Sequence, residues 1–524
     1  MLTMRESMEL AGQNLLATLA PTYDYLPLWR VYIDPGGAAE CEHFWASHNV
    51  GRWWDALLRL EAATGFRIPP ELEAPMLENL KRCLDNPLGV VCHLQPRRGI
   101  EPDGDPIGWF DDHSQREVLL ALAGLARQKG LGWAAELGSK LVRKLDGYIL
   151  ENGDWDFARM GAIVRQAGIP LSQPVLDFYS RLKGFALIGN TGRMIEALLE
   201  FYLAVGDGAA LQLAERLARI HFEVSTRPDG STPPAEHTHT HSLFGTYRGL
   251  LLYGLLAPAP AYVERIALTY RQTVRRHVRA SGFISHDLGT ERDGETAAPG
   301  DAAQLALWLA RAGYPEFLDD AERIVRARIL PSQITQPLGL HPRQDDGREE
   351  HTDLERRALG AYGGLLTQAH GGKNPTTDIT SADLHTLCDL YTHTVESTPL
   401  GLRLNFHFDY EDECIRVRAS RGSSARLDIH LKVPQPLLIR IPGWAPAESL
   451  RLQVDGQDAP ISWLGRFVLL SRPSGPVHIQ VEYDLPVTEL DETTDGVTYH
   501  FTWRGDEILS VKPNNDWLPF YPTG

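Results

Sequence analysis

Cysteine is scarce in this sequence, and the few cysteines present are scattered. The chain of 524 residues contains five, at positions 41, 83, 92, 388 and 414, with no CxxC pair among them. An odd number of dispersed thiols argues against a disulfide framework and favours a reducing compartment. The sequence shows no basic stretch leading into a short apolar one at its start, and no apolar run of membrane-spanning length. We therefore expect a cytoplasmic protein with no membrane partner.

Positive charge is also in deficit. Lys and Arg number 51 against 68 Asp and Glu, which gives a formal net charge of −17. An acidic chain is poorly suited to bind nucleic acid or an anionic membrane surface, whereas neutral, polyhydroxylated substrates remain compatible with it. The length exceeds that of one ordinary domain. Because no low-complexity linker interrupts the chain, we expect its parts to pack rigidly.

Residues 282 to 330 contain the pattern that organises the first part of the chain. A polar loop leads into a helix, Asp301 to Ala312, that is apolar nearly all round and must be buried. The next helix, Pro315 to Leu330, mixes charged and apolar residues and is predicted to keep one face in water. Such a pair, repeated around a ring, is the unit of an (α/α) toroid. Buried helices are predicted to begin near residues 50, 114, 191, 241, 301 and 381, which gives six hairpins.

Beyond residue 400 the hydrophobic period changes from helical to alternating. Short runs such as ARLDIHLKV and VHIQVEYDL are separated by turn residues, as in an antiparallel β-sandwich. The predicted fold is therefore mainly α, an (α/α)6 toroid followed by an antiparallel β-sandwich. We place the helical, catalytic domain at residues 1–398 and the sandwich at residues 399–524.

Polar side chains stand at the entrance to each predicted inner helix, where the loops of a toroid meet at one mouth. Helix N-termini favour Asp, Asn, Ser and Thr for capping alone, so a structural role covers many of these positions. Capping does not explain the histidines, nor Glu295, which lies six residues ahead of its predicted helix.

Carboxylates from different loops around one mouth are what glycoside hydrolysis requires. One donates a proton to the leaving oxygen, and the other acts as base or nucleophile on the opposite side. Glu295 is the first candidate, and the candidates for its partner are Asp287, Glu291, Asp378 and Asp112. For each partner, a solvated loop carboxylate is the alternative explanation.

We expect further side chains of the same loops to bind substrate hydroxyls, and an indole ring to stack on a sugar. The candidates are His48, Asn49, Asp112, His113, His239, His241, His286, Arg193 and Trp109. Trp53 and Trp54 are also candidates, but they lie within an apolar helix, where core packing is the alternative.

The run His237-Thr-His-Thr-His resembles a metal-binding segment, because alternate residues of an extended strand point the same way. No Cys or carboxylate set accompanies it in the sequence, so we expect neither a metal nor another cofactor. The expected partner is an oligosaccharide substrate. Self-association into a homo-oligomer stays open.

The order of several motifs resembles glycoside hydrolase family 127, the β-L-arabinofuranosidase-like enzymes. These motifs are HNVGRWWDALL, HTHSLFGTYRGLLLYG, GET before GDAAQLALWLARAGYPEFLDDAERIVR, DLHTLCDLYTHTVE before LRLNFHF, and LLIRIPGW before GRFVLLS. The resemblance extends over about residues 40 to 520 and implies the same toroid followed by β-sandwich material.

The resemblance also implies a zinc site, and there this sequence departs from the family. Family members bind zinc through a Glu-Thr-Cys motif and a later Cys-Cys pair, one cysteine of which attacks the sugar, with a separate Glu as acid/base. Here Glu295 and Thr296 match the first two residues of the motif, but Ala297 replaces its cysteine. The Cys-Cys pair falls on Asp378 and Ile379, and Cys388 lies about three turns further on. Asp287 or Glu291 is nearest to the acid/base position.

Three functions therefore remain. In the first, the protein is a glycosidase that has replaced cysteine chemistry with carboxylates, Glu295 with Asp378 or Asp287. In the second, it is a polysaccharide lyase for uronic acids; His239, His241, Tyr247 and Arg248 are the residues considered for that chemistry. In the third, it is a non-catalytic carbohydrate-binding protein. The acidic loops favour hydrolysis, because a lyase must neutralise a uronate.

Overall fold

The fold is known from a computed structural model. It describes residues 2–33, 37–40, 45–94, 108–181, 186–187, 189–235, 238–291, 293–364, 374–514, 518 and 521. His237, the first residue of the histidine run, lies outside this part of the chain.

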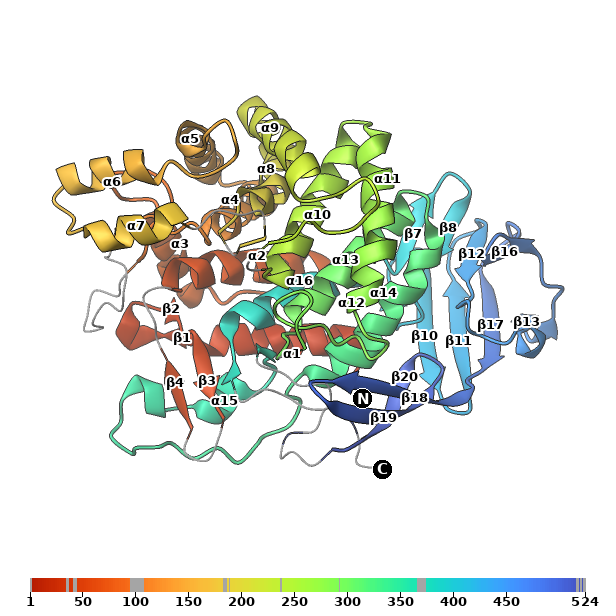
Figure 1. Cartoon of the computed structure of the whole chain (residues 1–524). Coiled ribbons are helices and arrows are strands. Elements are labelled where there is room, and N and C mark those ends of the chain that lie inside the picture. The colour runs from red at the N-terminus through yellow and green to blue at the C-terminus, as the bar shows by residue number, and fades with distance from the viewer. Residues whose placement is uncertain are drawn as a thin grey trace.

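An inner ring of helices forms the centre of the molecule. Among the described residues its members are α2 (Ala46–Thr64), α4 (Gln115–Lys129), α8 (Met194–Val205), α10 (Thr240–Leu256), α13 (Ala297–Arg311) and α16 (Thr377–Thr392). Each packs on the next, and α16 returns to α2, so the ring is closed. Figure 1 shows α10, α13 and α16 side by side. The helices begin close to the predicted positions, and the predicted toroid is confirmed.

Glycines allow the inner helices to approach one another closely. A Cβ on Gly51 of α2 would lie 2.6 Å from the Glu117 carbonyl carbon of α4. A Cβ on Gly249 of α10 would lie 2.8 Å from Ile195 of α8. Backbone contact at these points brings the polar N-terminal ends of the ring into a narrow space.

The outer layer consists of the helices that follow each inner one. These are α3 (Pro70–Arg82), α5 (Gly132–Tyr148), α9 (Gly208–Val224), α11 (Pro260–Thr269) and α14 (Leu318–Ile324). The outer partner of α16 comes instead from the N-terminus, because α1 (Met4–Ala17) packs on α16 and α2. The π-helical turn at 270–274 and the short α12 (Arg275–His277) extend α11, and a second π-helical turn at 325–329 extends α14.

Short segments join or decorate the ring. A helical hairpin, α6 (Phe157–Gln166) and α7 (Gln173–Arg181), is inserted between α5 and α8, and α15 (Leu354–Ala358) precedes α16. Paired short strands lie at the N-terminal side: β1 (Leu19–Ala20) with β2 (Leu26–Pro27), β3 (Arg30–Tyr32) with β4 (Ala38–Glu40), and β5 (Gly363–Gly364) with β6 (Asn374–Pro375).

The C-terminal part is a β-sandwich beside the helical ring (Figure 1). One sheet has the order β14-β13-β17-β11-β10-β9 and the other β15-β16-β12-β8-β7. Their bounds are β7 Val395–Thr398, β8 Gly401–Leu404, β9 Tyr410–Glu411, β10 Ile415–Arg421, β11 Ser424–Leu431, β12 Leu437–Arg440, β13 Arg451–Val454, β14 Gln457–Asp458, β15 Trp463–Leu464, β16 Phe467–Leu470 and β17 Val477–Asp484. One pairing departs from the antiparallel expectation, because β12 runs parallel to β8.

The last strands form a separate sheet rather than part of the sandwich. β18 (Val487–Thr494), β19 (Val497–Arg504) and β20 (Glu507–Lys512) pair in that order. Buried Phe501, Trp503 and Val511 of this sheet pack with Ala327, which follows α14. The sheet therefore closes over the outer layer of the ring.

The segment after Pro315 corrects one sequence expectation. Its predicted wet face is largely dry, since Glu322, Arg326 and Arg328 are all buried. Glu322 pairs with Arg326 at 2.6 Å and also with Arg440 of β12. The sequence pattern of a charged helix face is the same whether water or the charges of another domain cover that face.

Candidate active site

A cavity of about 230 Å³ lies at the N-terminal ends of the inner helices. Its polar lining includes two carboxylates and four histidines, and its apolar lining includes two indoles. The lining residues are Trp29, Arg30, Trp45, His113, His239, His241, His286, Glu295, Gly364, Thr376, Asp378 and Ile379. Of the residues expected from sequence, Glu295, Asp378, His113, His239, His241 and His286 therefore meet in one hollow.

Asp378 is held as a carboxylate at the first turn of α16. Thr376 caps that helix by accepting from the Ile379 N–H, and a helix N-terminus favours negative charge. His48 Nε2 lies 2.7 Å and Arg52 Nε 3.0 Å from Asp378 Oδ1. Burial opposes ionisation, but His48 and Arg52 outweigh it and hold the pKa of Asp378 well below its ordinary value.

Glu295 has the opposite environment. It lies just before α13, its side chain is 10% exposed, and its Oε1 has no hydrogen-bond partner among the residues that the structure describes. Burial raises the pKa of Glu295 to about 7; His286 opposes the rise, and the negative charges of Asp378 and Asp301 add to it. The cavity thus contains one ionised and one readily protonated carboxyl group.

Two histidines come together because two backbone segments pair. Thr240 N–H donates to the His286 carbonyl at 2.8 Å, and Leu288 N–H donates to the Thr238 carbonyl at 2.8 Å. The His239 and His286 ring centroids consequently lie 4.5 Å apart. Gly294 allows the loop to fold back on itself, since a Cβ there would lie 2.3 Å from the Ile284 carbonyl oxygen. Burial, together with His286 and His241, lowers the pKa of His239 well below its ordinary value.

His241, which lines the cavity, and His48, which lies outside the lining, are both held by neighbouring side chains. Arg52 lies 2.6 Å from His241 Nε2, and Asp301 accepts from Nδ1, so the ring is held between the two. His48 stacks on His113 with centroids 4.2 Å apart. Burial lowers the pKa of His113 well below its ordinary value, and His48 and Arg193 add to the effect.

Several residues expected in the site lie elsewhere. Asp287 and Glu291 do not line the cavity, and their side chains are 49% and 55% exposed. Glu291 accepts from the Asp495 N–H and so joins the loop to the β18–β19 turn. Trp109 is a core residue that packs against Phe157, with ring centroids 6.5 Å apart. It offers no face to a sugar.

Three other candidates are not among the residues that line the cavity. Asn49 is fully buried within α2, Arg193 pairs with Glu117 at 2.8 Å, and Asp112 is half-buried against Gly189. Trp53 and Trp54 are core residues, with indole N–H groups that donate to the Leu15 and Met76 carbonyls. Of the residues considered for a lyase, His239 and His241 line the cavity, but Tyr247 and Arg248 do not. Tyr247 bonds to Thr232, and Arg248 pairs with Glu196 and Asp301.

The aromatic wall was missed from the sequence. Trp29 and Trp45 stack in parallel, with centroids 4.6 Å apart and planes at 8°. Trp29 is positioned by the Thr377 N–H, which donates to its carbonyl, and Arg30 bridges to Thr376. These pairings join segments more than 340 residues apart, so no local pattern reveals them. The only sequence signal was that Trp45 directly precedes the first inner helix.

The zinc-thiolate set that the resemblance implies does not fit this cavity. Ala297 offers no ligand atom, and no described cysteine lines the cavity. Cys388 is buried within α16, and burial raises the pKa of its thiol well above the ordinary value. Among the described residues, this cavity therefore has no cysteine thiolate to act as nucleophile or as zinc ligand.

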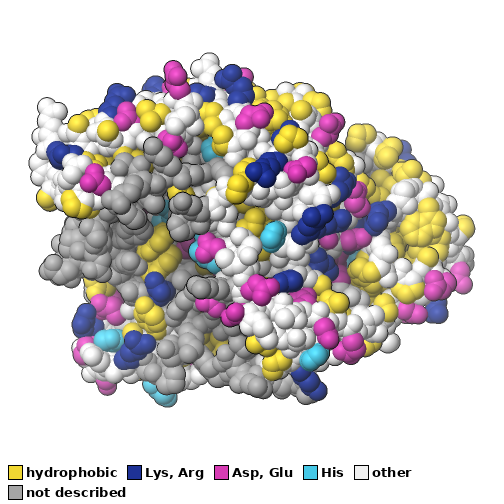
Figure 2. All heavy atoms as spheres, in the orientation of Figure 1, with side chains coloured by type: hydrophobic (Ala, Val, Ile, Leu, Met, Phe, Trp, Pro, Cys, Tyr) yellow, Lys and Arg dark blue, Asp and Glu magenta, His cyan; other side chains and the backbone are white. Residues whose placement is uncertain are grey.

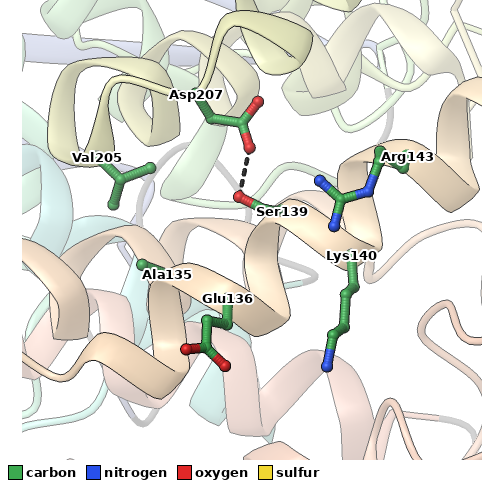
Figure 3. A pocket seen from close by; sticks show the side chains of 7 residues that line it. All are labelled: Ala135, Glu136, Ser139, Lys140, Arg143, Val205 and Asp207. Atoms are coloured by element: carbon green, nitrogen blue, oxygen red, sulfur yellow. Dashed lines mark hydrogen bonds between the residues drawn. The ribbon is translucent and has the colours of Figure 1, made fainter.

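A second hollow, of about 450 Å³, lies on the outer surface of the helical layer (Figure 3). It is lined by side chains of α5 and by Val205 and Asp207, and Ser139 donates to Asp207 there. Figure 3 shows Glu136, Lys140 and Arg143 along one helix, with no convergence on a common point. The inner cavity is the one that gathers titratable groups from several helices.

Charges of both signs lie on the face of the molecule drawn in Figure 2, where basic and acidic side chains are interspersed. Among the described residues, no helix combines the length and apolarity needed to cross a membrane.

Comparison with protein-family models and with curated proteins finds no match. Solved structures do match in fold. A GH127 β-L-arabinofuranosidase from Geobacillus stearothermophilus T6 is similar at a TM-score of 0.55 and 10% identity, over 89% of this chain and 77% of that one.

A second similar structure is a GH127 β-arabinofuranosidase, at a TM-score of 0.57 and 13% identity. The match covers 96% of this chain and 81% of that one. A third, described as a glycoside hydrolase, has a TM-score of 0.55 and 13% identity over 92% and 82% of the two chains. The resemblance predicted from the motifs is confirmed at the level of the fold.

Proposed function

We propose that this protein is a glycoside hydrolase that removes a single terminal sugar from an oligosaccharide. The observation that carries the proposal is the pair of carboxyl groups, Glu295 and Asp378, in one small cavity with an indole wall. Glycoside hydrolysis uses two such groups in opposite protonation states. Asp378 lies 3.0 Å from Arg52, whereas Glu295 lies 3.8 Å from His239, an imidazole whose pKa is lowered by burial.

The size of the cavity supports action at a chain end. About 230 Å³ is less than the roughly 300 Å³ at which pockets for drug-sized ligands begin, so the hollow suits one sugar ring. Trp45 supplies an apolar face, and the histidines supply polar groups for hydroxyls. The remainder of the oligosaccharide would extend outward from the mouth.

The roles of the two carboxyl groups follow from their partners. Glu295 donates its proton to the glycosidic oxygen as the bond to the anomeric carbon breaks. Asp378, held ionised by Arg52 and His48, either accepts a proton from the attacking water or attacks the anomeric carbon itself. In the first case the water oxygen bonds to the anomeric carbon. In the second, a later water releases the sugar from Asp378.

The test is a screen of the purified protein on aryl glycosides and plant oligosaccharides, with β-arabinofuranosides included because two similar structures are described as β-arabinofuranosidases. We expect release of a monosaccharide with a new reducing end and no ultraviolet-absorbing unsaturated product. Asp378→Asn should abolish release of the sugar. Asp287→Asn should leave it unchanged, because the Asp287 side chain is exposed and lies outside the cavity. Equal activity of wild type and Asp378→Asn would overturn the assignment.

A further inference from the structure

We infer that the cavity binds one divalent transition-metal ion, of the kind represented by Zn²⁺, through His239, His286 and Glu295. One ligand atom from each of the three residues lies within 4.8 Å of the other two. His239 Nε2 and Glu295 Oε1 are 3.8 Å apart. Two imidazoles and one carboxylate, with further positions open to solvent, form a donor set that suits zinc or another first-row divalent metal.

The orientation of His239 is set for this role. Its Nδ1 lies 2.7 Å from Ser242 Oγ, one turn further along α10, so Nε2 faces Glu295. Metal-binding histidines commonly have the second ring nitrogen fixed in this way. Pairing between residues 238–240 and 286–288 then places His286 beside His239, and the His286 side chain is 41% exposed, which gives an ion a route in.

Glu295 supplies an independent argument. Within the described part of the chain its buried Oε1 has no hydrogen-bond partner, and an unsatisfied buried acceptor is costly. The same oxygen is the one nearest to His239 Nε2. A cation between the three residues would satisfy it.

The other histidines of the cavity are engaged differently. Both ring nitrogens of His241 are taken, by Arg52 and Asp301, and His113 Nδ1 is bonded to Arg193. His48, which does not line the cavity, faces Asp378. The inferred ligand set also differs from the zinc-thiolate set of family 127. It shares only Glu295 with that set and takes its nitrogens from the start of α10 and from the loop before α13.

Metal binding has a consequence that rests on the proposed function. A carboxylate that ligates a metal has no proton to give, so a bound ion would inhibit the proposed hydrolysis. Binding itself does not depend on hydrolysis and is measured separately.

The test is a calorimetric titration of ZnCl₂ into protein stripped of metal with a chelator and dialysed. We expect one Zn²⁺ per chain. Ser242→Ala should weaken binding about 10- to 100-fold, as loss of an outer partner does, and His286→Ala and Glu295→Gln should weaken it by more than about 100-fold. Glu291→Gln, on the same loop but with a 55% exposed side chain outside the cavity, is the matched control and should bind as wild type does.

Each outcome decides one proposal. Failure of the wild type to bind, or wild-type affinity in both His286→Ala and Glu295→Gln, would overturn the metal site. His286 is partly exposed, so its variant should keep the wild-type melting curve, and that curve is measured alongside. Zinc binding without hydrolysis of any substrate would uphold the site and overturn the proposed function. Hydrolysis without zinc binding would uphold the proposed function and overturn the metal site.

Discussion

Buried charges of the described residues form one cluster around the cavity and another between the helical ring and the β-sandwich. In the interface cluster each charge faces an opposite one: Glu322 faces Arg326 and Arg440, and Asp506 lies 2.6 Å from Arg421. In the cavity Asp378 is matched in the same way, but Glu295 is not. Matched buried charges fix one arrangement of the chain, whereas a buried carboxyl group left unmatched is poised to exchange a proton or a ligand.

The largest expected effect is on hydrolysis. Glu295→Gln keeps the shape of the side chain but removes the proton that is donated, so we expect kcat to fall about 10²- to 10⁴-fold on the substrate found in the screen. The melting temperature should change little, because Glu295 has no ion pair to lose. Steady-state kinetics and a melting curve measured together check this. A variant with unchanged kcat would remove Glu295 from the chemistry.

The interface cluster should respond in the opposite sense. Glu322→Gln leaves Arg326 and Arg440 buried beside a neutral group, and breaking such a buried pair costs about 3–5 kcal/mol of unfolding free energy. Hydrolysis by the folded fraction should be unaffected. Urea unfolding measures the loss, with Glu316→Gln as control, because its pair with Arg271 is well exposed and contributes less than about 1 kcal/mol. Equal losses in both variants would contradict the distinction.

The pH dependence of stability gives a smaller effect at the same interface. His407 lies between Glu322, Arg440, Arg326 and Tyr483, and burial lowers its pKa to about 3, although Glu322 opposes the shift. The folded chain therefore keeps His407 neutral while the unfolded chain binds a proton below its ordinary pKa of 6.5. Its contribution to stability is complete above pH 6.5 and is lost as the pH falls toward 3, at a slope of up to about 1.4 kcal/mol per pH unit.

Unfolding free energies measured from pH 7 to pH 4 test this expectation. His407→Gln, which cannot take up the proton, should show a shallower loss with falling pH than the wild type. Parallel curves for the two proteins would show that His407 does not carry the effect.

The sequence was sufficient for the inner ring because α13 is apolar nearly all round and the other inner helices carry apolar residues at helical spacing, a pattern that is local in the sequence. It also placed Glu295 and the histidines near helix entrances, since position along a helix is local information. It was insufficient where distant segments meet. Two contacts depend on closure of the ring: the packing of α1 on α16, and the pairing of Arg30, which follows Trp29, with Thr376. The dry face of α14 depends on a sandwich that begins about 70 residues later.

The smallest effect separates Trp109, which was expected from the sequence to stack on a sugar, from Trp45, which was not. Trp45 lines the cavity, stacked on Trp29, whereas Trp109 is packed in the core. Trp45→Ala should raise KM about 3- to 10-fold with little change in kcat, because a stacking face contributes about 0.5–1.5 kcal/mol to binding in ground and transition states alike. Trp109→Phe should leave KM unchanged and lower only the melting temperature. If Trp109→Phe raised KM and Trp45→Ala did not, the sugar would bind near Trp109 and not at Trp45, and the cavity would not be the substrate site.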